Sequence, residues 1–256
     1  MSMRLYSKIY GDNSKDLIIL HGLFGMSDNW NSLGKKFAAH FRVHIVDLRN
    51  HGRSPHSNLF NYDVMCNDIL EYLNENQIQR SILLGHSLGG KIAMKFAFTH
   101  PELLEKIIVA DIAPKKYNTD FHENLLLKLS ELELLDFTSR SDLETKLSES
   151  IEDITIRSFL LKNLYRNENK EFAWRFNIKG LLNQLTNIQE DSFVKGFCDV
   201  PTYFIRGEKS NYITDEDIMK IKKHFTQYTV ATIDNAGHWL HAEKPVEFYN
   251  QVLASV

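Results

Sequence analysis

Short, mostly apolar runs recur along the chain, and each of them stops at a glycine or a polar residue. Six such runs lie at residues 17–20, 43–46, 82–84, 107–110, 203–205 and 229–233. Runs of this length, apolar throughout and bounded by turn residues, are typical of strands buried on both faces of a parallel sheet. Residues 4–10 are predicted to add an antiparallel strand at the edge of the sheet.

Segments with helical spacing of apolar residues separate these runs. The predicted helices lie at residues 27–39, 62–76, 88–100, 214–224 and 245–253. In the second of them, for example, Met65, Ile69 and Leu73 fall on one face. Alternation of strands and helices predicts βαβ units, and therefore an α/β fold with a mostly parallel sheet flanked by helices.

Residues 115–195 break this alternation. The segment is rich in Leu, Glu, Lys and Asn, contains no Pro, and has a single glycine, Gly180, so it is not a linker. Leu125, Leu126 and Leu129 form part of an apolar stripe, and residues 154–164 form another. We predict an all-helical cap at 115–195, inserted into a core made of residues 1–114 and 196–256.

Composition and charge exclude several classes of protein. The 256 residues are 43% hydrophobic and 25% charged, as in a globular protein, and the net charge of −3 gives no basic field for nucleic acid or an anionic membrane. No run of about 18 apolar residues predicts a membrane span, and the first residues do not resemble a signal peptide. Cys66 and Cys198 are too few for a disulfide scaffold or a zinc ribbon. We expect a cytoplasmic monomer or homodimer with no metal and no cofactor.

Ser87 lies in the sequence G-H-S-L-G, at the junction of a predicted strand and a predicted helix. The G-x-S-x-G pattern in this context is typical of a serine nucleophile held on a strained turn above the sheet. A solvent-exposed serine in an ordinary glycine-rich turn is the alternative, and the strand-to-helix context favours the nucleophile.

A serine nucleophile needs a base, and the base needs an acid that orients it. His238 follows the last strand in N-A-G-H-W and is the predicted base, with His241 as a surface residue. The predicted acid is Asp111, which follows the strand after the nucleophile, because parallel sheets place catalytic groups at strand carboxyl ends.

The more common position for this acid, after the penultimate strand, is occupied by Ser210. Ser210 is predicted to hydrogen-bond His238 as a fourth catalytic member. Glu208 is the second candidate for the acid, and Asp191 is the next to be tested if neither Asp111 nor Glu208 serves.

The loop H-G-L-F-G follows the first buried strand. A tetrahedral intermediate needs two backbone N–H donors for its oxyanion. We predict these to be Leu88, the residue after the nucleophile, and Leu23, with Phe24 as the next choice for the second. Residues 47–55, D-L-R-N-H-G-R-S-P, are predicted to tie loops together around the site.

Three aromatic residues are predicted to bind substrate: Phe24, Trp239 and Trp174. Trp174 belongs to the aromatic stretch F-A-W-R-F-N of the insertion. The aromatic side chains of this stretch fit an acyl pocket and the insertion's own core equally well, so both interpretations stay open.

Together these residues resemble the α/β-hydrolase superfamily. The resemblance rests on H-G-L-F-G, D-L-R-N-H-G-R-S-P, G-H-S-L-G-G-K and N-A-G-H-W-L-H-A-E-K-P in this order, and V-A-D-I-A-P and W-R-F-N are similar to small bacterial YbfF-type esterases and related α/β-hydrolase domain-containing proteins. It implies an eight-stranded sheet under a helical cap, and hydrolysis of short- to medium-chain acyl esters, with acyl-CoA thioesters as a further candidate. It also implies that residues matching Asp111 and Ser210 act with the catalytic histidine.

Other functions remain open at this stage because fold does not fix function. The same residues would serve a C–C hydrolase, a lyase or a perhydrolase, and a ligand-binding receptor can retain a vestigial triad. Dehalogenases and epoxide hydrolases are disfavoured, since they use an aspartate where this chain has Ser87.

Overall fold

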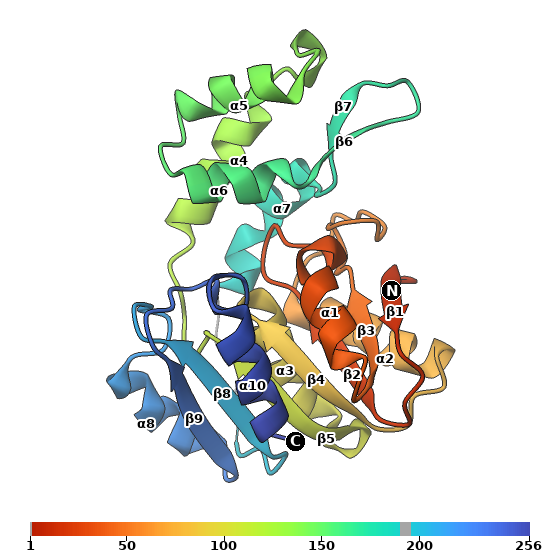
Figure 1. Cartoon of the computed structure of the whole chain (residues 1–256), viewed down its shortest axis with the longest axis vertical. Helices are drawn as coiled ribbons and strands as arrows, with labels where there is room; N and C mark the ends of the chain where they lie inside the picture. Colours follow the sequence, from red (N-terminus) through yellow and green to blue (C-terminus); the bar gives the residue numbers. More distant parts are fainter. Residues whose placement is uncertain (1, 190–195) are drawn as a thin grey trace.

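The structure is a computed structural model that describes residues 2–189 and 196–256. Its centre is a seven-stranded sheet with the order β1-β3-β2-β4-β5-β8-β9 (Figure 1). The strands are β1 Ser7–Tyr10, β2 Asp16–Leu20, β3 Arg42–Val46, β4 Ser81–His86, β5 Leu104–Ala110, β8 Thr202–Gly207 and β9 Tyr228–Ile233. β1 pairs with β3 in antiparallel fashion at the edge, and every other neighbouring pair of this sheet is parallel.

The seven strands are the seven segments predicted from the apolar runs and the edge segment. The expectation of an eighth strand is wrong for the part of the chain that the structure describes. That expectation came from the family resemblance alone, and no eighth apolar run exists in the sequence to form such a strand.

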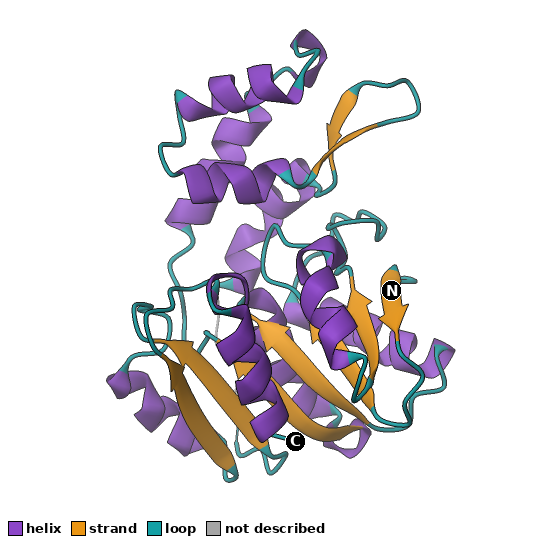
Figure 2. Cartoon of the chain, viewed as in Figure 1, coloured by secondary structure: helices purple, strands orange, loops and turns teal. Residues whose placement is uncertain are grey.

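Helices cover both faces of the sheet, which explains why the central strands are apolar throughout. In β2, Leu17 and Ile19 point into one core cluster, while Ile18 and Leu20 point into another on the opposite face. The first cluster also contains residues of α1 (Asn31–Phe37) and α10 (Pro245–Ala254), and the second contains residues of α2 (Tyr62–Glu75) and α3 (Leu88–Thr99). Figure 2 shows the sheet with helices on both of its faces. The core helices are α1 Asn31–Phe37, α2 Tyr62–Glu75, α3 Leu88–Thr99, α8 Asp215–His224, α9 Leu240–Glu243 and α10 Pro245–Ala254, with short 3-10 helices at Ser27–Trp30 and Pro101–Leu103.

The insertion leaves the core after β5 and returns before β8, and Figure 1 shows it above one end of the sheet. Its elements are α4 Asp120–Ser130, α5 Arg140–Ser148, α6 Ile154–Leu161, β6 Leu164–Arg166, β7 Phe172–Trp174 and α7 Ile178–Gln184, with short 3-10 helices at Leu134–Asp136 and Leu185–Ile188.

The prediction that the insertion is all-helical is wrong at β6 and β7, which form an antiparallel hairpin. Its turn is closed by Asn167, whose N–H donates to the carbonyl of Glu171, and by Lys170, whose backbone has a φ of +65°. Each strand has only three residues. Strands this short leave no alternating pattern that a sequence reading could detect.

The carboxyl ends of the six parallel strands meet at the edge of the sheet below the insertion. Five of the loops that follow them carry a predicted site residue: Leu23 after β2, Ser87 after β4, Asp111 after β5, Ser210 after β8 and His238 after β9. In the described residues, no helix combines the length and the apolar character needed to cross a bilayer.

Candidate active site

Ser87 lies on the sharp turn between β4 and α3. Its backbone has φ +52° and ψ −115°, in the left-handed half of the map that non-glycine residues avoid. The N–H of Ser87 donates to the carbonyl of Ala110, at 3.0 Å, which helps to hold the turn. A strained serine between a buried strand and a helix is the geometry that the G-x-S-x-G pattern predicts.

The glycines of the motif are required by close backbone packing. A Cβ atom on Gly85 would lie 2.2 Å from the carbonyl oxygen of Gly89, and one on Gly89 would lie 2.3 Å from the carbonyl oxygen of Leu20. Any side chain at these positions would push α3 away from β2 and β4. The two glycines therefore fix the height at which Ser87 stands above the sheet.

His238 and Asp111 form a close pair. The Nδ1 atom of His238 lies 2.7 Å from Oδ2 of Asp111. A carboxylate only accepts, so Nδ1 carries the proton and Nε2 is left as the acceptor for a proton from a nucleophile. Asp111 is completely buried, and its Oδ1 accepts the N–H of Gly207 at 3.1 Å.

The loop after β8 supports this carboxylate instead of supplying one. The hydroxyl of Ser210 donates to Oδ2 of Asp111. The predicted hydrogen bond from Ser210 to His238 is therefore wrong: Ser210 bonds Asp111, whose carboxylate lies between the two residues. Glu208 is exposed, and its Oε2 accepts the N–H of Asn235 at 2.7 Å. Asp191 lies outside the described residues.

Two residues that the sequence reading did not single out also hold His238. The ring of Tyr212 stacks on the imidazole, with centroids 3.6 Å apart and planes 15° from parallel. Nε2 of His86 lies 2.8 Å from the carbonyl oxygen of His238 and donates to it. Tyr212 lies in the same loop as Ser210, and His86 is the variable position before the serine, so neither has a motif of its own.

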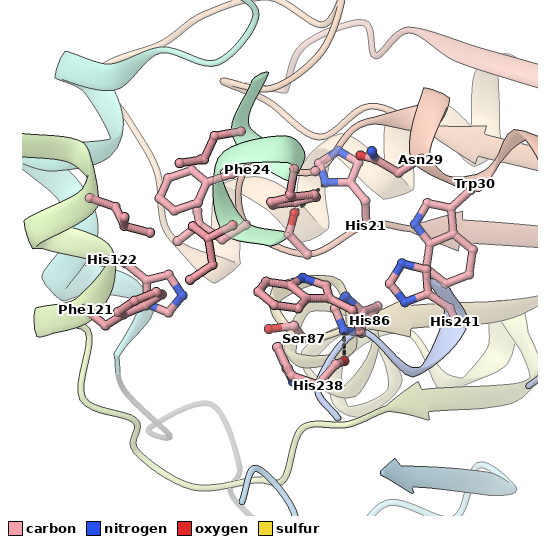
Figure 3. Close-up of a pocket in the computed structure, with 18 residues that line it drawn as sticks. His21, Phe24, Asn29, Trp30, His86, Ser87, Phe121, His122, His238 and His241 are labelled. Atoms are coloured by element: carbon pink, nitrogen blue, oxygen red, sulfur yellow. Dashed lines mark hydrogen bonds between the residues drawn. The ribbon is translucent and has the colours of Figure 1, made fainter. Parts of the chain in front are cut away.

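Ser87 and His238 line the same cavity (Figure 3), and no hydrogen bond joins the Ser87 hydroxyl to the imidazole in this structure. Such a bond is often long in ligand-free enzymes and shortens when substrate binds. The pair is therefore compatible with nucleophile and base.

The loop after β2 brings a backbone donor next to the serine. A Cβ atom on Gly22 would lie 3.3 Å from the Cβ of Ser87, so the loop passes directly over the nucleophile. The turn is closed by the N–H of Gly25, which donates to the carbonyl of Gly22 at 2.9 Å. Leu23 follows Gly22, and Leu88 is the first residue of α3, where an N–H has no acceptor within the helix. Both predicted oxyanion donors thus flank Ser87.

His21 links this loop to the next one. Its Nδ1 lies 2.8 Å from the carbonyl oxygen of Gly22 and donates to it, while Nε2 accepts the N–H of Leu48 at 3.0 Å. Burial lowers the pKa of His21 to about 4, so the ring is neutral at pH 7.

Loop 47–55 has the connecting role that its charged residues predict. Asp47 accepts the N–H groups of Ser27 and Arg53, at 2.5 and 2.8 Å. The guanidinium of Arg49 binds both carboxylate oxygens of Asp68, at 2.6 and 2.7 Å, with both side chains almost completely buried. These contacts connect the loop to α2 and to the start of the first 3-10 helix.

The cavity above Ser87, called the main cavity below, lies between the core and the insertion. From the core it is lined by the loop after β2 and by the region of His238, including the predicted residues Phe24 and Trp239. The insertion lines it from α4 and α6 with Phe121, His122, Leu125, Ile156, Phe159 and Leu160. Its insertion side is therefore almost wholly apolar.

Trp174 does not line this cavity, so of the two interpretations left open for its aromatic stretch the structure favours packing within the insertion. Its indole stacks on Phe176, with centroids 5.5 Å apart, and Phe176 in turn lies 5.4 Å from Phe24. Trp174 is thus separated from the main cavity by the rings of Phe176 and Phe24, and it belongs to the packing of the insertion.

A second opening, the side cavity, adjoins the main one. It is lined by Leu23, Tyr62, Ser87, Leu88, Lys91, Ile112, Tyr117, Asn118, Thr119, His122, Ile188 and Tyr212. Among the residues that the structure describes, only Leu23, Ser87 and His122 line both cavities. Within residues 2–189 and 196–256, no group of three or more His, Cys, Asp or Glu side chains is placed to hold a metal ion.

Comparison with known proteins gives one consistent result. The sequence profile of the alpha/beta hydrolase fold family matches residues 16–245. The chain is 34% identical to the sn-1-specific diacylglycerol lipase ABHD11 of Danio rerio, over 94% of this chain and 78% of that protein. It is 30% identical to Esterase YbfF of Escherichia coli, over 91% of this chain and 89% of that protein. A solved structure described as a marine microorganism esterase superposes with a TM-score of 0.96 at 38% identity, covering 100% of both chains.

Proposed function

The chain belongs to the α/β-hydrolase fold family, and we propose that it hydrolyses carboxylic esters through an acyl-enzyme intermediate formed on Ser87. Hydrolysis of carboxylic esters is the reaction class of its esterase and lipase relatives, and the chain is a carboxylic ester hydrolase on this basis. The single observation that carries the role of Ser87 is its strained turn, which shares a cavity with a histidine already paired to a buried carboxylate.

In the proposed first half-reaction, Nε2 of His238 takes the proton of the Ser87 hydroxyl as its oxygen attacks the ester carbonyl. The tetrahedral oxyanion accepts hydrogen bonds from the N–H groups of Leu23 and Leu88. Asp111 stabilises the imidazolium that forms and keeps the ring in the Nδ1–H tautomer. His238 then gives its proton to the departing alcohol oxygen, and the acyl group remains on Ser87.

In the second half-reaction, a water molecule replaces the alcohol. His238 takes a proton from this water, which attacks the acyl-serine carbonyl, and the same oxyanion donors act again. Collapse of the second tetrahedral intermediate releases the carboxylic acid and returns the proton to Ser87. The cycle needs no group beyond those already described.

The insertion is proposed to act as a cap that shapes the substrate site. Residues 115–195 contribute the apolar surface of α4 and α6 to the main cavity, opposite Ser87, and the segment's last residues, 190–195, lie outside the described part. Such a surface suits short- to medium-chain acyl groups. Acyl-CoA thioesters are a further candidate because their carbonyl requires the same nucleophile and the same oxyanion donors.

A series of p-nitrophenyl esters of increasing chain length tests the proposal, with a matched butyryl ester and butyryl-CoA to compare oxygen and sulfur leaving groups. We expect Ser87-dependent turnover with an optimum at short to medium chains. A wild-type protein that binds these esters but does not turn them over would favour a ligand-binding receptor. Turnover that is unchanged in Ser87→Ala would exclude the acyl-enzyme on this serine.

A further inference from the structure

His122 is a polar residue on an otherwise apolar surface. It lies on α4, and the other insertion residues that line the main cavity are Phe121, Leu125, Ile156, Phe159 and Leu160. A polar group placed among such side chains costs free energy unless it finds a hydrogen-bond partner. A phenylalanine or leucine would fill the same place without that cost.

The ring of His122 has no such partner within the described part of the chain. It packs against the rings of Phe24 and Phe121, with centroid distances of 5.9 and 5.5 Å. Its Nδ1 atom is buried without a hydrogen bond, which leaves Nε2 as the nitrogen on the cavity side. An unpaired acceptor is tolerated in protein interiors more often than an unpaired N–H, so the proton belongs on Nε2.

His122 also lies at the reacting centre. It shares with Ser87 and Leu23 the property of lining both cavities. Figure 3 shows its ring reaching from the insertion side towards Ser87. A substrate whose carbonyl lies between Ser87 and the oxyanion donors would therefore place its neighbouring atoms against His122.

The charge state of His122 suits this position. Burial, together with the nearby His238, lowers the pKa of His122 to about 4, so its imidazole is neutral at pH 7. A neutral donor does not oppose the positive charge that forms on His238 during the reaction, whereas a lysine or arginine at this place would.

From this geometry we propose that His122 is a specificity-determining residue that donates its Nε2–H to a second oxygen of the substrate, a few bonds from the scissile carbonyl. The favoured substrates are then oxygenated esters, such as hydroxy-substituted ones, in preference to plain alkyl esters. The oxygen can lie on the acyl side or on the alcohol side of the ester. This inference rests on the proposed ester hydrolysis at Ser87.

Three esters distinguish these cases: ethyl butyrate as the apolar reference, ethyl 3-hydroxybutyrate for the acyl side, and 2-hydroxyethyl butyrate for the alcohol side. For the wild type and for His122→Phe, kcat/KM is measured on each ester and expressed relative to ethyl butyrate. Comparing these ratios between the two proteins removes differences in intrinsic reactivity. Phenylalanine, with a slightly larger ring, can keep the ring contacts with Phe24 and Phe121 and has no nitrogen to donate or accept a hydrogen bond.

We expect His122→Phe to lower the relative kcat/KM of one of the two hydroxy esters about tenfold, the effect of one lost buried hydrogen bond. The side that responds shows where the oxygen binds. His122→Gln, which keeps an N–H donor, should retain part of the preference. Phe121→Leu, a neighbouring change in the same wall, should leave both relative values unchanged.

The inference is overturned if His122→Phe slows all three esters equally, or changes neither relative value. If the wild type hydrolyses no ester at all, the p-nitrophenyl esters included, the proposed function fails; if it hydrolyses p-nitrophenyl esters but none of these three, the inference alone fails, so the two failures are distinguishable. Thermal unfolding checks that each variant is folded, and His122→Leu replaces His122→Phe if the latter is not.

Discussion

Ser210 and His238 donate hydrogen bonds to the same oxygen, Oδ2 of Asp111. The carboxylate comes from the end of β5, while its support comes from the end of β8, where Gly207 also donates its N–H to Oδ1. The two strands are neighbours in the sheet. The carboxylate that orients His238 can therefore come from the end of either strand, with the other strand supplying hydrogen bonds to it. Ser210 occupies the position where a carboxylate is expected, and its hydroxyl donates to the carboxylate of Asp111.

This arrangement predicts that Asp111 is the essential acid. Asp111→Asn should lower kcat by roughly 10⁴, as in the reference serine protease, because the amide favours the wrong imidazole tautomer and cannot stabilise the imidazolium. KM should change little, since Asp111 lines neither cavity. Steady-state kinetics on a p-nitrophenyl ester measures both constants.

Glu208→Gln is the matched control. Its carboxylate is exposed and accepts a backbone N–H from Asn235, so turnover should stay close to the wild-type value. An inactive Glu208→Gln alongside an active Asp111→Asn would move the acid to the loop after β8. If neither variant loses activity, Asp191 is the next position to test.

Ser210→Ala is expected to give an intermediate loss of kcat, about tenfold. The change removes one of three donors to the carboxylate and leaves the pair with His238 intact. Thermal unfolding should show a small loss of stability. A loss as large as that of Asp111→Asn would instead make Ser210 an equal member of the catalytic group.

Ser87→Ala should abolish turnover and leave the thermal unfolding temperature nearly unchanged, because only a hydroxyl in the cavity is removed. A phosphonate ester should modify Ser87 in the wild-type protein, and peptide mapping by mass spectrometry identifies the labelled serine. Labelling at another serine, or activity that survives the substitution, would contradict the nucleophile assignment.

The positions of Ser87, Asp111 and His238 could be predicted because each follows an apolar run that becomes a strand. A parallel sheet brings such strand ends to one edge, whatever the distance along the chain. The pattern does not specify hydrogen-bond partners. It therefore predicts Ser210 beside His238. The pairing of β5 with β8 instead places the carboxylate of Asp111 between these two residues.

The insertion could be predicted less well, because its fold depends on contacts that have no fixed spacing. The hairpin of β6 and β7 has three residues in each strand, and the aromatic stretch that contains Trp174 suits a cavity wall as well as a core. His122 is a single histidine in an ordinary helical pattern. Its importance comes from the unpartnered nitrogen and the shared cavity lining, which no sequence pattern records.

Substitutions of Phe159 and Trp174 test which of the two residues shapes the acyl pocket. Phe159 lines the main cavity and lies 5.8 Å from the ring of Trp239, whereas Trp174 lies behind Phe176. Phe159→Ala should shift the preferred p-nitrophenyl ester towards longer chains by opening the wall. Trp174→Ala should lower stability by a few kcal/mol and keep the wild-type chain-length profile. A shifted profile in Trp174→Ala would restore that residue to the substrate site.

The buried histidines around the site predict how stability depends on pH. Burial lowers the pKa of His21 to about 4 and the pKa values of His51 and His241 to about 3, whereas an unfolded chain titrates near 6.5. Between about pH 7 and 5 the unfolded state therefore binds protons that the folded state does not. We therefore expect stability to fall as the pH is lowered through this window, which lies above the range in which most carboxylates titrate.

His241→Phe isolates one of these contributions. The sequence predicts His241 as a surface residue, but it is buried. It stacks on Trp30, with centroids 4.2 Å apart and planes 2° from parallel, so phenylalanine preserves the ring contact and removes the titrating group. Urea unfolding at pH 7, 6 and 5 gives the free energy of unfolding at each pH. A difference of one bound proton between the unfolded and folded states changes the free energy of unfolding by about 1.4 kcal/mol per pH unit. The free energy of unfolding of the variant should therefore depend less steeply on pH, by up to that amount. A wild-type stability that stays constant or rises from pH 7 to 5 would mean that these histidines gain protons in the folded protein as readily as in the unfolded chain.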